Sequence, residues 1–554
     1  MKILLVDIDS LRPDHLGCYG YDRNTSPTID AIAERGVRFD RCFVSDAPCL
    51  PSRTALATCR HGLNSGVVTH HGEGQNYDEP GDGHDPDADR MLAFRHLAEH
   101  GVYTASVSQF SQRHLAHHFS ASFQESITPT ATAGGPATED CSDVTPVAQS
   151  WLERHADDED WLLHVNYWDV HHPYLGIEEF VDPVRDSGPA PAWPDQDAID
   201  DQQGMTGVRC ADLWPDTSQY GPDWLDFYDW PMPESVTDRD DVEQFVDGYD
   251  ASIRRVDGEI ATLLETLDRN GIREETAVVV TADHGEAFGE HGIYAEHAFP
   301  HPACQQVPLI VSWPGVTDDV GGDCDGAGAS SDDSDSNGVD TSSDDAGTAT
   351  IAGSSTDTLV YQFDLVPTIC DLADVPIPAG WDAEAFTPAL RGDPFEGRDF
   401  LVSEQGIYTY GRAVYRGKWL YIRLMHPGVF SSPGLYNDPE LPTDGLELLH
   451  DLESDPHTTR NLVESNPEKT AELRATLDRW LVSQLSDDWP AQRPVDARGR
   501  DPLARTASIG PYLYVDPDDL LELYREHDHL GTDAQIEALE RTMKTFPRNA
   551  SSSR

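Results

Sequence analysis

Residues 240–286 read DDVEQFVDGYDASIRRVDGEIATLLETLDRNGIREETAVVVTADHGE, and this stretch decides the fold class. Apolar residues recur in its first part at helical spacing, which predicts a long helix over 240–271 with Gly271 as its C-terminal stop. TAVVVTA (276–282) is short and rich in β-branched residues, so it predicts a buried strand. A long helix that feeds directly into a buried strand is the unit of a doubly wound, mostly parallel α/β sheet.

Two further apolar runs predict buried parallel strands of the same sheet, ILLV (3–6) and WLLHVNYW (161–168). Polar residues follow each of these runs, just as DHGE follows TAVVVTA. Ligands of doubly wound sheets bind beyond the carboxyl ends of the strands. We therefore expect Asp9, His171 and Asp283, which come from three separate segments, to meet at one site.

A chain of 554 residues exceeds the length at which a single hydrophobic core usually stops growing, so more than one domain is expected. The α/β sheet and its helices are predicted to occupy residues 1–395. Within them, residues 316–357 are rich in Asp, Ser and Gly and are predicted to form a solvated, disordered loop. Short alternating runs predict a smaller antiparallel sheet followed by a helix over 396–490, and residues 491–554 predict a helical extension.

The net charge sets the chain apart from most globular proteins, since 100 Asp and Glu against 38 Lys and Arg give −62. Self-repulsion at this charge destabilises a compact state in dilute buffer, whereas at about 1 M salt the Debye length of roughly 3 Å screens it. We therefore interpret the chain as a halophilic protein that works in concentrated salt. A nucleic-acid partner is not expected, because binding to phosphates requires the opposite charge.

The cysteines and the first residues give no sign of secretion or of a membrane. The nine cysteines form no CxxC pair, which argues against a disulfide framework and against a zinc site. The apolar run in MKILLVDIDS is four residues long, too short for a signal-peptide core or a membrane span. We expect a cytoplasmic protein with no membrane partner.

The segment DAPCLPSRT (46–54) places a cysteine four residues ahead of an arginine. If a helix begins with SRTALATC (52–59), Cys49 lies just before its N-terminus, where free N–H groups and the helix dipole favour anions. Arg53 on the first turn can direct a planar set of donors to the same place. These residues alone leave two interpretations open: a nucleophile or anion site, and a buried structural cysteine.

Several segments together resemble the sulfatase family of the alkaline phosphatase superfamily. CLPSR (49–53) matches the family's C-x-P-S-R signature, in which the cysteine is oxidised to formylglycine. DIDSLRPDHLGCYGY (7–21) and TADHGEAFGEHG (281–292) resemble its two metal-binding segments, and DVHHPY (169–174) resembles its D-P-H-x-P segment. VPLIVSWPG (307–315) and LLHDLESDPHTTRNL (448–462) resemble a later strand and the family's C-terminal passage. The resemblance runs from residue 1 to about 485 and implies an alkaline-phosphatase-like fold.

The resemblance implies a role for each residue that matches a family motif. Cys49, as formylglycine, would attack the sulfur of a sulfate ester through its hydrated aldehyde, and Arg53 would stabilise that group and the bound sulfate. Asp9, Asp283 and His284 would hold one divalent cation. The resemblance implies Ca²⁺ or Mg²⁺, with Ca²⁺ as our first expectation, and the imidazole ligand leaves Mn²⁺ open.

Two further histidines match family positions, and the metal segment departs from the family at one position. His171 would contact the sulfate or the leaving group and act as a general acid. His297 aligns with a histidine after the second metal segment, although Glu296 stands where the family's usual lysine is expected. Ser10 stands where many relatives carry a second Asp, and Asp7, on the same strand face as Asp9, is a candidate to compensate.

A more serious departure lies in GVYTASVSQFSQRH (101–114), which occupies the place of the family's G-x-x-T-x-x-x-G-K-W-H. Gln109 stands there in place of the sulfate-binding lysine. Arg113 or His114 is the expected replacement donor. Without the lysines, the substrate pocket is expected to differ from that of an arylsulfatase.

These observations lead to one main hypothesis and two alternatives. The main hypothesis is a formylglycine-dependent sulfatase that hydrolyses a sulfate monoester of a sugar or another small organic molecule. A formylglycine-generating enzyme would be its transient partner. One alternative is a phosphonate monoester or phosphodiester hydrolase of the same superfamily. The other is a catalytically inactive binding or scaffold protein that keeps the fold.

Overall fold

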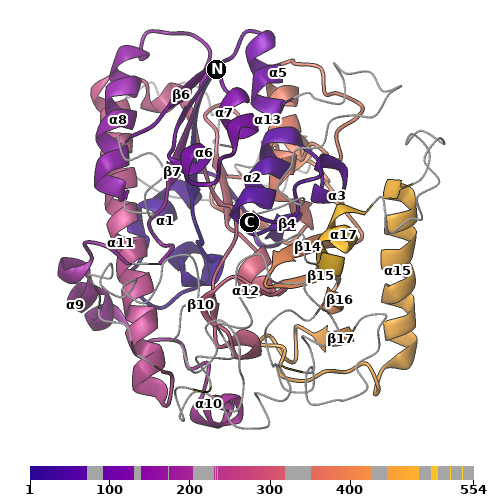
Figure 1. Ribbon diagram of the computed structural model, residues 1–554. Coiled ribbons are helices and arrows are strands. Elements are labelled where there is room, and N and C mark those ends of the chain that lie inside the picture. The colour runs from indigo at the N-terminus through magenta and orange to yellow at the C-terminus, as the bar shows by residue number, and fades with distance from the viewer. Residues whose placement is uncertain are drawn as a thin grey trace, which may run out of the picture.

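A computed structural model gives the fold, and the elements named here are those of Figure 1. The structure describes residues 1–70, 92–129, 139–172, 174–203, 230, 233, 235–317, 351–426, 446–485, 501–509, 525 and 540.

An eight-stranded sheet forms the centre of the larger part of the molecule. Its order is β12 (Ser354–Thr356), β2 (Val37–Phe39), β11 (Leu309–Ser312), β8 (Thr276–Ala282), β1 (Lys2–Ile8), β7 (Trp161–Tyr167), β5 (Tyr103–Val107) and β6 (Glu125–Ile127). β1 pairs in parallel with both β7 and β8, while β11 is antiparallel to its two neighbours. The three predicted strands are thus adjacent in the middle of the sheet, and the predicted mostly parallel α/β fold is confirmed.

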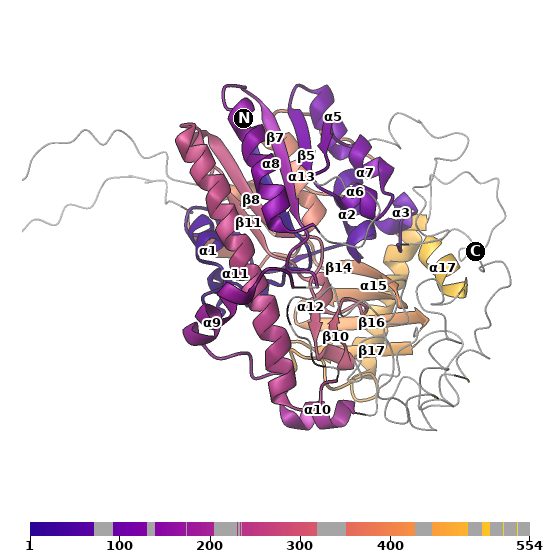
Figure 2. The same cartoon turned by 60° about the vertical axis from the view of Figure 1, so that its left-hand side comes forward.

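Helices cover both faces of this sheet, as Figures 1 and 2 show. α8 (Cys141–Arg154) and α11 (Arg239–Arg269) lie on one side, and α2 (Cys49–Thr58), α5 (Ala93–Glu99) and α13 (Leu365–Leu372) lie on the other. α11 matches the predicted helix over 240–271. Asp238 caps its N-terminus, and Gly271 takes the left-handed φ of +70° that ends a helix most readily.

A smaller antiparallel sheet follows in the chain, as predicted. It consists of β14 (Leu401–Ile407), β15 (Thr409–Arg416), β16 (Trp419–His426) and β17 (Leu446–Asp451). α15 (Pro467–Leu485) packs on it through Leu473, Leu477 and Trp480. Sequence analysis missed a fifth strand, β4 (Asp46–Ala47), which pairs in parallel with β14 just ahead of Cys49. The smaller sheet is therefore joined directly to the segment that carries the candidate nucleophile.

The remaining elements are short and mainly connect the strands. They are η1 (Pro13–His15), η2 (Gly17–Tyr19), α1 (Pro27–Ala33), β3 (Cys42–Phe43), α3 (Gly62–Ser65), α6 (Phe110–Arg113), α7 (His117–Ala121), α9 (Glu178–Ser187), α10 (Gln196–Gln202), η5 (Arg273–Glu275), β9 (Ala287–Phe288), η6 (Glu290–Gly292), β10 (Tyr294–Glu296), α12 (Pro302–Gln305), β13 (Val360–Tyr361), η7 (Gln362–Asp364), α14 (Thr387–Leu390) and α17 (Pro502–Ile509).

The predicted domain ranges stay predictions. Most of the predicted disordered loop and most of the predicted C-terminal helices lie outside the described residues. Among the helices that are described, no helix is long and apolar enough to cross a membrane.

The junction between the two sheets contains a buried pair of acids, Asp46 on β4 and Glu404 on β14. Burial and the neighbouring Glu404 raise the pKa of Asp46 well above its ordinary value. Above about pH 4 the unfolded chain ionises this carboxyl group while the folded chain keeps it protonated. Between about pH 4 and the pKa of Asp46 in the folded protein, the free energy of unfolding therefore falls by up to about 1.4 kcal/mol for each pH unit.

Asp46→Asn is therefore expected to flatten the pH dependence of stability. The amide keeps a donor toward Glu404 and an acceptor for the backbone N–H of Gly62, which Asp46 binds at 2.9 Å. Denaturant unfolding at pH 4.5 and pH 7.5 measures the effect. An equal loss of stability between the two pH values in the parent and the variant would contradict the assignment of the retained proton to Asp46.

Candidate active site

Cys49 is the first residue of α2, a helix that is buried along its whole length. The helix begins three residues earlier than predicted, because Pro51 then falls in the first turn, where helix N–H groups have no acceptor. Sγ of Cys49 lies 3.0 Å from Nε2 of His284. Burial, with the carboxyl groups of Asp9 and Asp283, raises the pKa of the thiol well above its ordinary value. The unmodified side chain is therefore a neutral thiol, which is a poor nucleophile.

The guanidinium of Arg53 is surrounded by three carboxyl groups, and all four side chains are fully buried. Its Nε and Nη2 donate to the two oxygens of Asp7 at 2.9 and 3.3 Å. Its Nη1 donates to Asp9 at 2.8 Å and also to Asp283. One positive charge thus faces three acids in a site closed to water.

Asp9 and Asp283 respond to this environment in opposite directions. Burial opposes the ionisation of Asp9, but the charges of Arg53 and Arg113 favour it, and the pKa of Asp9 lies below its ordinary value. For Asp283, burial together with Asp9 and Asp7 outweighs Arg53, so its pKa lies well above its ordinary value. The second acid is hard to ionise because the first already is. A bound cation would remove this conflict.

His284 presents an unprotonated nitrogen to the same carboxyl groups. Its Nδ1 lies 2.9 Å from the carbonyl oxygen of Gly285, which can only accept, so Nδ1 carries the proton. Burial, with the nearby His297, lowers the pKa of His284 to about 3, so the ring is neutral.

Gly285 lets the backbone next to His284 pass close to α12, since a Cβ there would lie 2.1 Å from the carbonyl oxygen of Ala303.

These residues fit a divalent cation. Ligand atoms of Asp9, Cys49, Asp283 and His284 all lie within 4.8 Å of one another, and all four residues are buried. Two carboxylates suit Ca²⁺ or Mg²⁺, and the neutral imidazole also suits Mn²⁺. The excess of buried acid over base calls for further positive charge. The predicted ligands Asp9, Asp283 and His284 are thus brought together.

Asp7 and Ser10 bind residues of the site but do not belong to the described group that fits a cation. The carboxyl group of Asp7 binds Arg53 and lies 3.2 Å from Nε2 of His164, and it is outside the described group that fits a metal. Ser10 donates from Oγ to Asp9 at 3.2 Å and from its N–H to Asp283 at 3.3 Å. Ser10, which stands in place of a second Asp, therefore orients Asp9 through its side chain and Asp283 through its backbone N–H.

His171 lies in the loop after β7, at the carboxyl end of the sheet, as predicted. Its Nδ1 donates to the carbonyl of His172 at 2.6 Å, which leaves Nε2 as the acceptor of the neutral ring. Burial lowers its pKa well below the ordinary value, with a further contribution from His297 and an opposing one from Asp9. Its ring centroid is 6.4 Å from that of His284. Asp9, His171 and Asp283 therefore converge as predicted.

Arg113, at the end of α6, lies near the candidate nucleophile. Its charge acts on both Cys49 and Asp9. It pairs with Glu139, and its guanidinium carbon lies 3.6 Å from the ring centroid of Trp168. The next residue, His114, has its pKa lowered well below the ordinary value by burial and by the charges of His70 and Arg113. Of the two predicted replacement donors, only Arg113 therefore brings a positive charge.

His297 lies 4.2 Å from His284 between ring centroids, and its ring nitrogen also lies close to the Sγ of Cys49. Burial opposes its protonation, but Glu296 and Glu286 outweigh burial and raise its pKa to about 9. Glu296, which replaces the family's lysine, is 3.3 Å from Nδ1 of His297. The acid at 296 thus favours a positive charge on the neighbouring imidazole.

Sequence analysis missed Trp168 and Glu139, which hold Arg113. Trp168 closes the apolar run WLLHVNYW and therefore looked like the last residue of the strand. The pattern of acids around residue 139 offers no signal, because acids occur along the whole chain.

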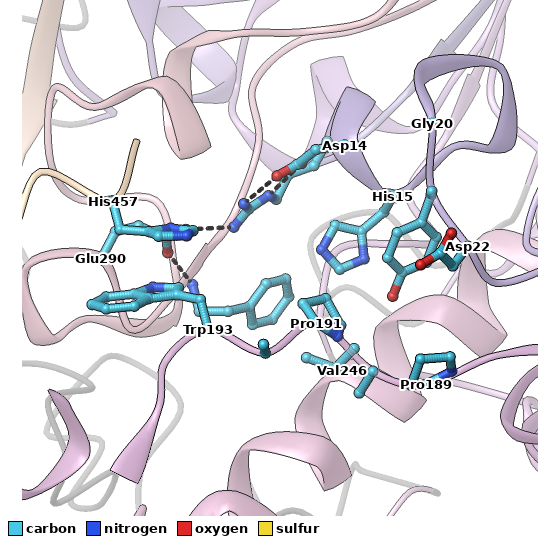
Figure 3. Close-up of a pocket in the computed structure, with 15 residues that line it drawn as sticks. Asp14, His15, Gly20, Asp22, Pro189, Pro191, Trp193, Val246, Glu290 and His457 are labelled. Carbon is cyan, nitrogen blue, oxygen red and sulfur yellow. Dashed lines mark hydrogen bonds and ion pairs between the residues drawn. The ribbon is translucent and has the colours of Figure 1, made fainter. Parts of the chain in front are cut away.

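A separate cavity of about 440 Å³ lies beside the segment that follows Asp9 (Figure 3). Trp193 and His457 are stacked in its wall, with ring centroids 4.3 Å apart. Arg12 also lines it, binds Asp14 and Glu290, and donates to the carbonyl of Glu286 at 2.9 Å. The wall of this cavity thereby braces the segment that carries Asp283 and His284.

The chain is similar to known proteins in sequence and in fold. The family model described as Sulfatase matches residues 2–375. Human iduronate 2-sulfatase is 27% identical over 372 residues, which cover 57% of this chain and 60% of that protein, less than two thirds of its length.

Two further likenesses cover most of the chain. The Delta 4,5-hexuronate-2-O-sulfatase of Bacteroides thetaiotaomicron is 22% identical over 530 residues, covering 92% of this chain and 93% of that protein. The solved phosphonate monoester hydrolase of Agrobacterium radiobacter has a TM-score of 0.62 at 18% identity, covering 89% of this chain and 100% of that one. The match to the structure from Agrobacterium radiobacter shows that the two chains share a fold.

Proposed function

The chain belongs to the sulfatase family of sulfuric ester hydrolases, and we propose that it hydrolyses a sulfate monoester with formylglycine at position 49 and one divalent cation. One observation carries the proposal: Cys49 lies at a helix N-terminus, fully buried, against Arg53 and a group of Asp9, Asp283 and His284 that fits a cation. As a thiol it is held neutral, so the site suits a modified residue better than thiolate chemistry.

Each residue has a part in the proposed reaction. The hydrated aldehyde at position 49 would supply the hydroxyl group that attacks sulfur, and the cation, held by Asp9, Asp283 and His284, would neutralise sulfate oxygens. Arg53 orients the carboxyl groups and adds positive charge beside residue 49. His171 would lie near the bound sulfate, whose negative charge favours the protonated form of the imidazole. It can then protonate the leaving alcohol.

We propose a sulfated sugar as the substrate class. The support is the likeness to two proteins whose names give them iduronate and hexuronate sulfate esters as substrates. A formylglycine-generating enzyme that acts on CLPSR would be a transient partner. The cytoplasmic location and the requirement for concentrated salt stay predictions.

Rates on matched sulfate and phosphonate monoesters of one leaving group test the proposed reaction. A higher kcat/KM on the sulfate ester is expected. The reverse preference would favour the phosphonate monoester or phosphodiester alternative, to which the shared fold also gives support. Absence of turnover on both esters, with an unmodified thiol and no metal in the native protein, would favour the binding or scaffold alternative.

Arg113→Gln tests the replacement of the family's lysine. Loss of a charge-assisted contact to the sulfate is expected to lower kcat/KM by roughly 10- to 100-fold, mainly through KM. Gln109 is buried at the position where the lysine is expected. Adding Gln109→Lys to Arg113→Gln is therefore expected to restore part of the loss. Steady-state kinetics of the parent, the single variant and the double variant measure it, and an unchanged KM in Arg113→Gln would contradict this role.

A further inference from the structure

The loop that carries His171 begins with an aromatic residue, Trp168, directly after the last residue of β7. The ring of His171 stacks on Trp168, with centroids 3.9 Å apart and an interplanar angle of 25°. The guanidinium carbon of Arg113 lies over the same indole, 3.6 Å from its centroid. Two planar groups cannot both lie this close on the same face of a ring, so Trp168 is held between them.

The two residues that follow Trp168 are held by α11. The N–H of Val170 donates to Oγ of Ser252 at 3.1 Å, and Asp169 accepts from Nη1 of Arg255 at 3.0 Å. Val170 has a φ of +88°, a left-handed value that a β-branched residue rarely adopts. Backbone strain of this kind persists only where the surroundings impose it, and it clusters at functional sites.

The other side of the stack is fixed as well. Arg113 pairs with Glu139, and the adjacent Asp140 pairs with Arg255 at 3.1 Å. Arg113 and His171, which both stack on Trp168, are therefore both linked to Arg255 of α11, Arg113 through residues 139 and 140 and His171 through the loop residue Asp169.

We propose that Trp168 is a positioning residue that sets the spacing between the sulfate-binding Arg113 and the proton-donating His171. The proposal rests on the proposed function for the roles of those two residues, but the three-layer stack is independent of it. The stack supplies a fixed distance between two groups from different segments. Errors of about 1 Å in such a distance cost roughly 100-fold in rate. A cation over an indole face is also favourable in its own right.

Two substitutions separate the aromatic face from the volume of the side chain. Trp168→Phe keeps a ring between Arg113 and His171 and is expected to retain kcat/KM within about 5-fold. Trp168→Met gives a side chain that is nearer to phenylalanine in volume but has no π face, and it is expected to lower kcat/KM about 100-fold. Trp381→Leu is the matched control, because Trp381 is buried to a similar degree (9% against 6% exposed) and contacts His96. The folded Trp381→Leu variant is expected to have the same kcat/KM as the parent.

A double-mutant cycle with Arg113→Gln gives a readout that a purely structural role would not move. Trp168→Met is expected to cost less than about 10-fold once Arg113 is already lost, because the two changes disrupt the same arrangement. Additive losses, or a folded Trp168→Met variant with the parent's kcat/KM, would overturn the proposal. If Trp168→Met does not fold, a 100-fold loss in folded Trp168→Phe would overturn it as well.

The failure of this inference is distinguishable from failure of the proposed function. Turnover of a sulfate monoester by the parent protein is measured first. If the parent turns over no sulfate ester, the proposed function fails, and the same cycle is then measured on the affinity for inorganic sulfate by calorimetry. Coupling between positions 168 and 113 in that affinity would support the stack, and additivity would contradict it.

Discussion

Cys49→Ala is expected to lower the hydrolysis of a sulfate monoester by about 10⁵-fold or more, the scale seen when a nucleophile that works as part of a unit is removed. Alanine has no group that can be oxidised to an aldehyde. The carboxyl groups, Arg53 and the cation would remain, but they only bind and polarise the ester. Initial rates at saturating and at low substrate concentration measure the change.

The matched control for this loss is Cys370→Ala. Cys370 lies in α13 and is as fully buried as Cys49, so the two substitutions remove a similar apolar contact. Cys370→Ala is expected to lower the melting temperature while kcat/KM stays near that of the parent. Activity of the folded Cys49→Ala variant within 10-fold of the parent would contradict the role of residue 49.

Asp283→Asn is expected to remove the bound cation and to lower kcat/KM by about 10³-fold. Asp283 is one of four residues that fit the ion, and an amide at this position takes away a full negative charge. Elemental analysis is expected to find one divalent cation per chain in the parent and much less than one in the variant. Added cation should raise the melting temperature of the parent only, because a ligand stabilises the folded state that binds it.

Asp7→Asn separates loss of the metal from loss of buried charge in general. Asp7 is as buried as Asp283 and also binds Arg53, yet it lies outside the described group that fits a metal. The Asp7 variant is therefore expected to keep its cation. Equal loss of cation from both variants would show that the metal depends on the whole acidic cluster and would contradict the ligand set Asp9, Asp283 and His284.

The order of hydrophobic and polar residues was enough to predict the central part of the fold. Three buried strands and the long helix α11 each have a strong period or a continuous apolar run, and such signals depend little on distant contacts. Because parallel strands end at one edge of a sheet, the polar residues after β1, β7 and β8 had to converge. The sequence pattern therefore predicts that Asp9, His171 and Asp283 lie close together, as they do at this edge of the sheet.

Other parts of the site depend on contacts that carry no local pattern. β4 is two residues long, and it forms only because β14, from far along the chain, offers it a partner. The stack joins Arg113 to Trp168 and His171, which lie 55 and 58 positions later in the chain, and neither Arg113 nor Trp168 carries a local pattern that indicates the contact. The displacement of the start of α2 to Cys49 likewise reflects the tolerance of a first helical turn for proline, which blurs helix boundaries in sequence.

The most direct test of the central claim is mass spectrometry of the peptide that contains Cys49, from protein purified in high salt from its native host. The account predicts an aldehyde, or its hydrate, in place of the thiol at position 49, and unmodified thiols at Cys59 and Cys370. A thiol retained at position 49 in protein that hydrolyses sulfate esters would contradict the account, because the catalytic nucleophile would then have to lie elsewhere.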